Sequence, residues 1–199
     1  MTASATPIFR STSQALHFAY LIEAYGVSID SVMSKAIRRI MMELGIWNTG
    51  EPSTVNFGGL SALEVRAQCA MIRAAVRSRL PGPESWAVEA RYGINKIITE
   101  NGQHYIVFQS YRYDAVLRLG DWLRPSFPAL SPITVDILVA RAVDKRVCTY
   151  RAMAKQMGIS KDACARALKR IRERLQELEN IAIDRLTPQF VADGLVAPQ

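Results

Sequence analysis

The sequence predicts a mainly α-helical protein, in which a helical N-terminal body with a small β-hairpin precedes a C-terminal helix-turn-helix domain. Apolar residues recur every three or four positions along most of the chain, as they do in amphipathic helices. One stretch, 94–109, is instead rich in Ile, Val, Tyr and Phe around Asn101-Gly102, a dipeptide typical of a tight hairpin turn. A segment with three prolines, 122–132, separates the body, 1–125, from the C-terminal domain, 126–199.

The body is predicted to begin with a helical hairpin. Thr12 or Ser13 can cap a helix over 14–25, because their hydroxyls can accept a hydrogen bond from a free backbone N–H. Ser28 can cap a second helix over 29–44, where apolar residues repeat at helical spacing.

After a loop over 47–59, the sequence predicts two further helices. Ser61-Ala-Leu-Glu64 has the pattern of a capping box and opens a helix that should reach Arg79. A proline-rich break follows, and a helix should resume over 84–91.

Two groups of cations in the body have open interpretations. Three arginines on one helix face are either a contact for nucleic acid or a protein partner, or a solvated face; they are Arg66, Arg73 and Arg77. Alternating rings and cations are either a platform for single-stranded nucleic acid or, with better support, core packing; they are Tyr105, Phe108, Tyr111, Arg112, Tyr113 and Arg118.

The C-terminal domain centres on two helices joined at a glycine. Thr149 can cap a short helix over 150–157, Gly158 supplies a left-handed turn, and Ser160 can cap a second helix. Ala154 lies four residues before the glycine, where a small side chain lets two helices cross closely. This spacing predicts a helix-turn-helix.

The second helix should continue to about Asp184, and Thr187-Pro188 should start a last short helix that Gly194 ends. An apolar row on the long helix must be covered, either by the helix over 133–143 of the same chain or by a dimer partner. This row consists of Cys164, Leu168, Ile171, Leu175 and Leu178.

Basic charge is concentrated in the same region. Between Arg141 and Arg174 there are eleven Lys or Arg residues and three acids, a local balance of +8, whereas the whole chain carries +7 with a pI near 9.6. Cations crowd the first half of the second helix, where the helix dipole disfavours them. An external polyanion would remove that penalty, so we expect double-stranded DNA as the partner, although an acidic protein or a membrane surface would also suit the charge.

Helical position predicts the role of each residue. Candidates to reach base edges in a major groove lie on the first turns: Ser160, Lys161, Asp162, Ala165 and Arg166. Residues expected over the DNA backbone are Lys155, Lys169, Arg170 and Arg172. The alternative is a solvated basic face.

No enzyme, metal site or cofactor is expected. His17 and His104 are isolated, and three widely spaced cysteines indicate reduced thiols. Carboxylates could be paired by folding for metal-dependent nuclease work, but ordinary surface acids explain them; they are Glu84, Glu89, Asp114 and Asp121. No membrane span or secretory signal is found, so a cytoplasmic location is expected.

Two resemblances carry the function further. Leu130-Ser-Pro, the run Tyr-Arg-Ala-Met-Ala-Lys-Gln-Met-Gly-Ile-Ser-Lys over 150–161 and Ala-Leu-Lys-Arg-Ile-Arg-Glu-Arg-Leu over 167–175 together resemble the helix-turn-helix of sigma factor region 4. With Phe9-Arg-Ser-Thr, Val65-Arg-Ala-Gln-Cys-Ala-Met and Ala90-Arg-Tyr-Gly, the wider chain resembles phage and prophage late-gene regulators of the Q antiterminator type.

The second resemblance implies a transcription regulator that binds DNA beside a promoter, engages bacterial RNA polymerase paused nearby and travels with it past terminators. It implies that Lys161, Asp162, Arg166 and Arg170 read DNA, and that the body faces the polymerase. Some family members carry a zinc motif, which this chain lacks. The alternatives are a dimeric helix-turn-helix repressor or activator that acts at initiation and, with least support, a subunit of a metal-dependent nuclease or recombinase.

Overall fold

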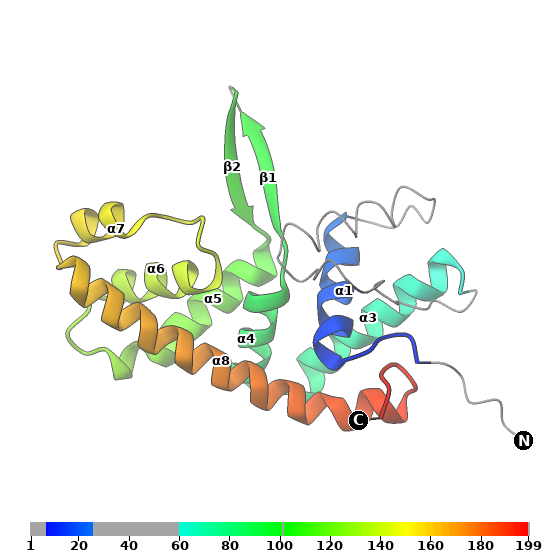
Figure 1. Cartoon of the computed structure of the whole chain (residues 1–199). Coiled ribbons are helices and arrows are strands. Elements are labelled where there is room, and N and C mark those ends of the chain that lie inside the picture. The colour runs from blue at the N-terminus through cyan, green and yellow to red at the C-terminus, as the bar shows by residue number, and fades with distance from the viewer. Residues whose placement is uncertain (1–6, 26–59, 101, 199) are drawn as a thin grey trace, which may run out of the picture. The chain divides into compact units, whose positions relative to one another are not determined.

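The computed structural model describes residues 7–25, 60–100 and 102–198 and is mainly helical (Figure 1). The predicted helix over 29–44 and loop over 47–59 lie outside the described residues. Contacts divide the chain into two compact units, one from Met1–Ala75 with Leu186–Gln199 and one from Val76–Arg185. In the described part of the chain, no helix is both long and apolar enough to cross a membrane.

The first unit contains α1 (Thr12–Tyr25), most of α3 (Ala62–Arg79) and the end of α8 (Lys161–Ala192). Its α1 is capped one residue earlier than predicted, because the Ser11 hydroxyl accepts a hydrogen bond from the backbone N–H of Gln14 at 3.2 Å. The capping box before α3 is confirmed, since Glu64 accepts from the backbone N–H of Ser61 at 2.7 Å and the Ser61 hydroxyl accepts from the N–H of Glu64 at 3.4 Å.

The second unit begins with two helices on either side of a β-hairpin. The order is α4 (Gly82–Tyr92), β1 (Asn95–Glu100), β2 (Gln103–Phe108) and α5 (Ser110–Leu123). The strands are antiparallel and Glu100 pairs with Gln103, which leaves two residues for the turn. Gly102 there has φ +75°, a conformation that favours glycine. The predicted hairpin is confirmed, and it extends away from α4 and α5 (Figure 1).

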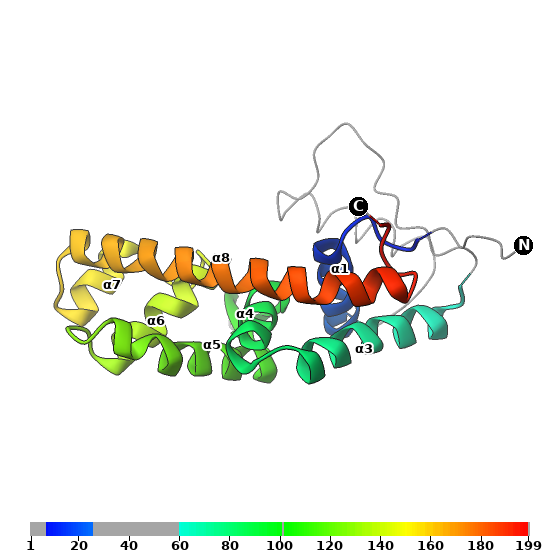
Figure 2. The ribbon, with the colours of Figure 1, turned by 90° about the horizontal axis from the view of Figure 1, so that it is seen from below.

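The rest of the second unit is η1 (Arg124–Ser126), α6 (Pro132–Val143), α7 (Tyr150–Met157) and the first part of α8. The first half of α8 lies along α6 and α5, with α7 beside its N-terminus (Figures 1 and 2). Ser131 caps α6 by accepting from the N–H of Thr134 at 3.2 Å, with Pro132 in the first turn.

One buried cluster holds these helices together. The apolar row of α8 is covered within the same chain, as the first of the two alternatives predicted, because Leu168 and Ile171 share this cluster with Leu138 of α6. Leu123, Phe127 and Val135 also belong to it, so the proline-rich segment 122–132 lies inside the second unit. The compact units therefore differ from the predicted domains, 1–125 and 126–199.

The predicted end of the long helix is wrong. Helix α8 continues through Pro188 to Ala192 and does not give way to a separate short helix. Pro188 removes one backbone N–H, but Leu186 and Phe190 on either side are each 1% exposed, and their burial favours the continued helix. Gly194 does terminate it, with φ +69° and hydrogen bonds from Gly194 N to Val191 O at 3.0 Å and Leu195 N to Phe190 O at 2.9 Å.

Candidate nucleic-acid interface

The backbone around Gly158 follows the predicted pattern. The Thr149 hydroxyl accepts from the N–H of Ala152 at 3.2 Å and caps α7. Gly158 follows α7 with φ +65° and ψ 22°, which is left-handed. The Ser160 hydroxyl accepts from the N–H of Ala163 at 3.1 Å and caps α8. Both caps and the turn are confirmed, and together they set the direction in which α8 leaves α7.

Side chains from both helices share the buried cluster, which holds α7 against the start of α8. Met153 of α7 is buried with Cys164 and Leu168 of α8, and Met157 and Ile159 pack against the same cluster. Burial raises the pKa of the Cys164 thiol, so the thiol stays protonated at neutral pH. This sulfur therefore packs as part of the core and is not a reactive group.

The side of α8 away from the buried row carries most of the predicted site. Lys161, Asp162, Ala165, Arg166 and Lys169 are all exposed there, and Lys155 is exposed on α7. Within the described residues, Lys161 and Arg166 form no ion pair. Lys169 lies 3.8 Å from Glu173, a loose contact between two exposed side chains. A polyanion could reach these cations without breaking a strong contact.

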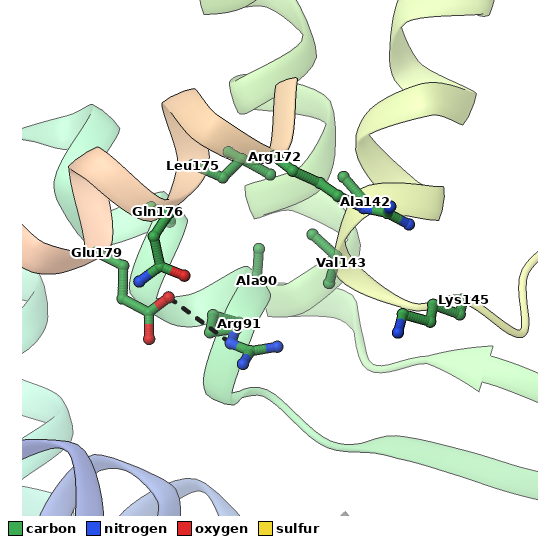
Figure 3. Close-up of a pocket in the computed structure, with 10 residues that line it drawn as sticks. Ala90, Arg91, Ala142, Val143, Lys145, Arg172, Leu175, Gln176 and Glu179 are labelled. Carbon is green, nitrogen blue, oxygen red and sulfur yellow. Dashed lines mark ion pairs between the residues drawn. The ribbon is translucent and has the colours of Figure 1, made fainter. Parts of the chain in front are cut away.

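Two further predicted residues, Arg170 and Arg172, have additional neighbours in the fold. The Arg170 guanidinium stacks over the Phe127 ring at 5.1 Å, and Arg174 stacks similarly over Trp122 at 5.2 Å. Arg172, about three turns beyond the start of α8, lines a pocket with Arg91 of α4 (Figure 3). The structure therefore groups the nine candidate residues into an exposed face, a stacked arginine and a pocket arginine.

The loop that leads into α7 is anchored by a buried carboxylate that the sequence analysis did not single out. Asp144 accepts from the Arg146 side chain at 3.0 and 2.8 Å, from the backbone N–H of Arg146 at 2.9 Å and from the Asn95 amide at 2.8 Å. Burial alone favours a higher pKa, but these hydrogen bonds and the charges of Arg146 and Arg112 hold the pKa of Asp144 below its ordinary value. This network joins β1 to the start of the α7 segment.

Replacing this carboxylate should destabilise the protein in a pH-dependent way. Asp144→Asn should lower the free energy of unfolding by roughly 1–3 kcal/mol at neutral pH, because charge-assisted hydrogen bonds are lost. Since the folded-state pKa is depressed, this contribution is present above the unfolded pKa of about 4 and is lost as pH falls through the folded value. Urea unfolding of wild type and variant should therefore give stabilities that converge as the pH falls below about 4.

The control is Asp114→Asn, which alters an exposed carboxylate on α5 in the same unit. It should change stability by less than about 0.5 kcal/mol at neutral pH. An Asp144→Asn defect that persisted undiminished in acid would contradict the role assigned to the ionised carboxylate.

Several cations of the two groups in the body contact other parts of the protein. Arg73 donates to the backbone oxygen of Ala19 at 2.8 Å and lies 3.3 Å from Glu23, so the idea that the three arginines form one open face is wrong. Arg77 pairs with Glu89 at 2.9 Å, and Arg66 is exposed.

Core packing explains most of the alternating rings and cations. Arg112 is buried, donates to the backbone oxygen of Ala90 at 2.8 Å and lies 5.1 Å from the centre of the Phe108 ring. Burial lowers the pKa of Arg112 to about 10, although the charge of Asp144 opposes the shift. Arg118 stacks over Trp86 at 5.7 Å. Arg112 and Arg118 therefore stack on rings of the protein itself and do not form a continuous platform for single-stranded nucleic acid.

The carboxylates considered for nuclease chemistry are mostly paired with arginines. Glu84 lies 3.0 Å from Arg185, and Asp121 lies 2.6 Å from Arg124. Across residues 7–25, 60–100 and 102–198, no cluster of three or more His, Cys, Asp or Glu residues could hold a metal ion.

Comparison with known proteins adds no family assignment. No protein-family model matches the chain, and no curated protein sequence gives a significant match.

Proposed function

We propose that α7, the turn at Gly158 and α8 form a helix-turn-helix that binds double-stranded DNA in a sequence-specific way. In this arrangement the first turns of the second helix enter the major groove. The observation that carries the proposal is the cationic, exposed side of α8 directly behind its Ser160 cap, opposite a side that is fully buried in the core.

The electrostatics of this face favour an anionic partner. Lys161 and Arg166 have no ion pair in the described chain, and Lys161 lies in the first turn of α8, where the positive end of the helix dipole disfavours a cation by a few tenths of a kcal/mol. Phosphate groups would offset this repulsion and would also release counterions from the DNA. Cations that served only solubility would have no physical reason to lie near the N-terminus of α8.

Position divides the readers of bases from the backbone contacts. Lys161, Asp162, Ala165 and Arg166 project from the turns that would lie deepest in the groove, and the hydroxyl of Ser160 can still donate while it caps the helix. Contacts to the DNA backbone are assigned to Lys155, Lys169 and Arg170, whereas Arg172, the fourth residue predicted there, lines the pocket with Arg91.

Two single substitutions test this division. Arg166→Ala should relax base preference at one position of the preferred site at a cost of about 1–3 kcal/mol, whereas Lys169→Ala should weaken all duplexes alike. The measurement is selection from a random duplex library followed by titration of the selected and scrambled sites. Arg66→Ala, which removes an exposed arginine of α3, is the control and should bind as wild type does. Wild-type behaviour of both α8 variants would rule out this groove assignment.

We further propose that the chain acts as an antiterminator of the Q type, binding DNA near a promoter, engaging RNA polymerase and permitting readthrough of terminators. This step is supported by the resemblance of the wider chain. The competing function is that of a repressor or activator acting only at initiation. A dimeric repressor or activator could not use the apolar row of α8 as its dimer interface, because α6 already covers that row.

An in vitro transcription assay separates the two functions. The template carries the selected binding site beside a promoter, with a terminator downstream, and a matched template carries a scrambled site. Readthrough that requires the site supports antitermination. Unchanged termination despite tight binding to the site would overturn it and leave the DNA-binding proposal intact.

A further inference from the structure

The second unit contains a pocket of about 220 Å³ formed by α4, the end of α6, the loop after α6, and α8. Its floor is apolar and includes Ala90, Val143 and Leu175. Three cations come to its rim from three segments of the chain: Arg91 from α4, Lys145 from the loop after α6 and Arg172 from α8 (Figure 3).

The charges around this pocket are not balanced. Glu179 is the carboxylate in its lining, and it already accepts from the Tyr92 hydroxyl at 2.8 Å and lies 3.6 Å from Arg91. Lys145 and Arg172 form no ion pair with the parts of the chain that the structure describes. Two cations without an ion pair there therefore line one small pocket, and an anion between them would reduce their mutual repulsion.

We propose that this pocket binds the phosphate group of a small phosphorylated ligand. Arg172 can meet a phosphate with two parallel N–H donors, and Lys145 supplies a second positive charge. A phosphate dianion matches this charge better than a single carboxylate does. The apolar floor would take a non-ionic part of the ligand, such as a nucleobase or sugar.

The phosphate belongs to a small molecule and not to duplex DNA, for two reasons. The pocket is concave and is lined by α4 as well as α8, and Arg172 lies six residues beyond Arg166, roughly 9 Å along the helix axis from the last residue assigned to base edges. A ligand that bridged Lys145 and Arg172 would also tie the segment leading into α7 to α8. Any effect on DNA affinity depends on the proposed function, whereas binding to the pocket does not.

The test uses the full chain with adenosine monophosphate and inorganic pyrophosphate as probes, titrated calorimetrically at constant ionic strength. We expect saturable binding of at least one probe, and Arg172→Gln and Lys145→Gln should each weaken it by about tenfold or more, as loss of a charge-assisted contact predicts. The control is Arg174→Gln, two residues further along and on the opposite side of α8 over Trp122, which should bind as wild type does. Circular dichroism without ligand checks that the variants fold.

Two outcomes would overturn the proposal. One is the absence of saturable binding of either probe up to about 10 mM, well above the range of specific ligand sites. The other is equal binding by Arg172→Gln and Arg174→Gln. A parallel titration with duplex DNA identifies the source of the phosphate: if Arg172→Gln loses DNA affinity as strongly as Lys169→Ala while wild type binds neither probe, the pocket holds a DNA phosphate and the small-ligand site is wrong. A failure here leaves the tests of Arg166 and Lys169 unaffected.

Discussion

Duplex DNA should bind the full chain several-hundred-fold more weakly at about 200 mM salt than at about 50 mM. About five phosphate contacts are expected, and each contributes a slope of roughly 0.9 in a plot of log affinity against log salt concentration. Lys155, Lys169 and Arg170 would supply three of them, and Lys161 and Arg166, although assigned to base edges, would also neutralise the phosphates that flank the groove. All five side chains are exposed in the structure. Fluorescence anisotropy of a labelled duplex at several salt concentrations gives the slope directly.

Single substitutions show whether these side chains produce the slope. Lys169→Ala should reduce the magnitude of the slope by roughly 0.9, because one phosphate contact, and the counterion release that goes with it, is lost. Arg66→Ala should leave it unchanged. Two results would contradict DNA binding by these cations. One is an affinity that hardly varies with salt concentration. The other is a slope that stays the same when Lys155, Lys161 and Lys169 are each replaced by Ala.

Leu168→Ala should lower the free energy of unfolding by roughly 2–5 kcal/mol, the largest stability effect that we expect from one substitution. Leu168 is fully buried where α8 meets α6 and α7, and it belongs to the cluster that also contains Leu138 and Met153. Truncation removes apolar contacts and leaves a cavity among helices that are already packed on several sides. The loss should appear as a lower midpoint in urea unfolding followed by circular dichroism.

Ile133→Ala is the matched control for that measurement. Ile133 lies on α6 in the same unit, but its side chain is 69% exposed, so the change should alter stability by less than about 0.5 kcal/mol. Similar costs for the two substitutions would contradict the packing of α8 against α6. The Leu168 variant should also lose DNA affinity near its own melting temperature, since the direction of α8 depends on this core.

Features that depend on a few neighbouring residues could be predicted from the sequence. The caps at Thr149 and Ser160, the left-handed Gly158 and the turn at Gly102 form as expected, because each depends on one hydroxyl or on the absence of one Cβ. The sequence also predicted that the apolar row of α8 is buried, since a row that repeats every three or four residues has to be covered, but it left α6 and a dimer partner as alternatives that only packing decided.

Features that depend on residues far apart in the chain could not be predicted. Asp144 is one acid among many until folding brings Asn95, Arg112 and Arg146 around it, and a signal as short as Asp144-Lys-Arg146 carries no information about burial. The basic residues of α8 also look alike in the sequence, yet Arg170 stacks on Phe127 and Arg172 lines a pocket.

The sequence by itself determined that the chain is mainly helical, where α7 and α8 begin, and that positive charge gathers near them, because backbone propensity, capping and net charge are local or additive properties. Only the tertiary structure decided that α8 continues past Pro188, that the segment 122–132 lies within a compact unit, and which cations remain open to a partner. These outcomes depend on burial and on long-range contacts, whose free energy exceeds the local preferences of single residues.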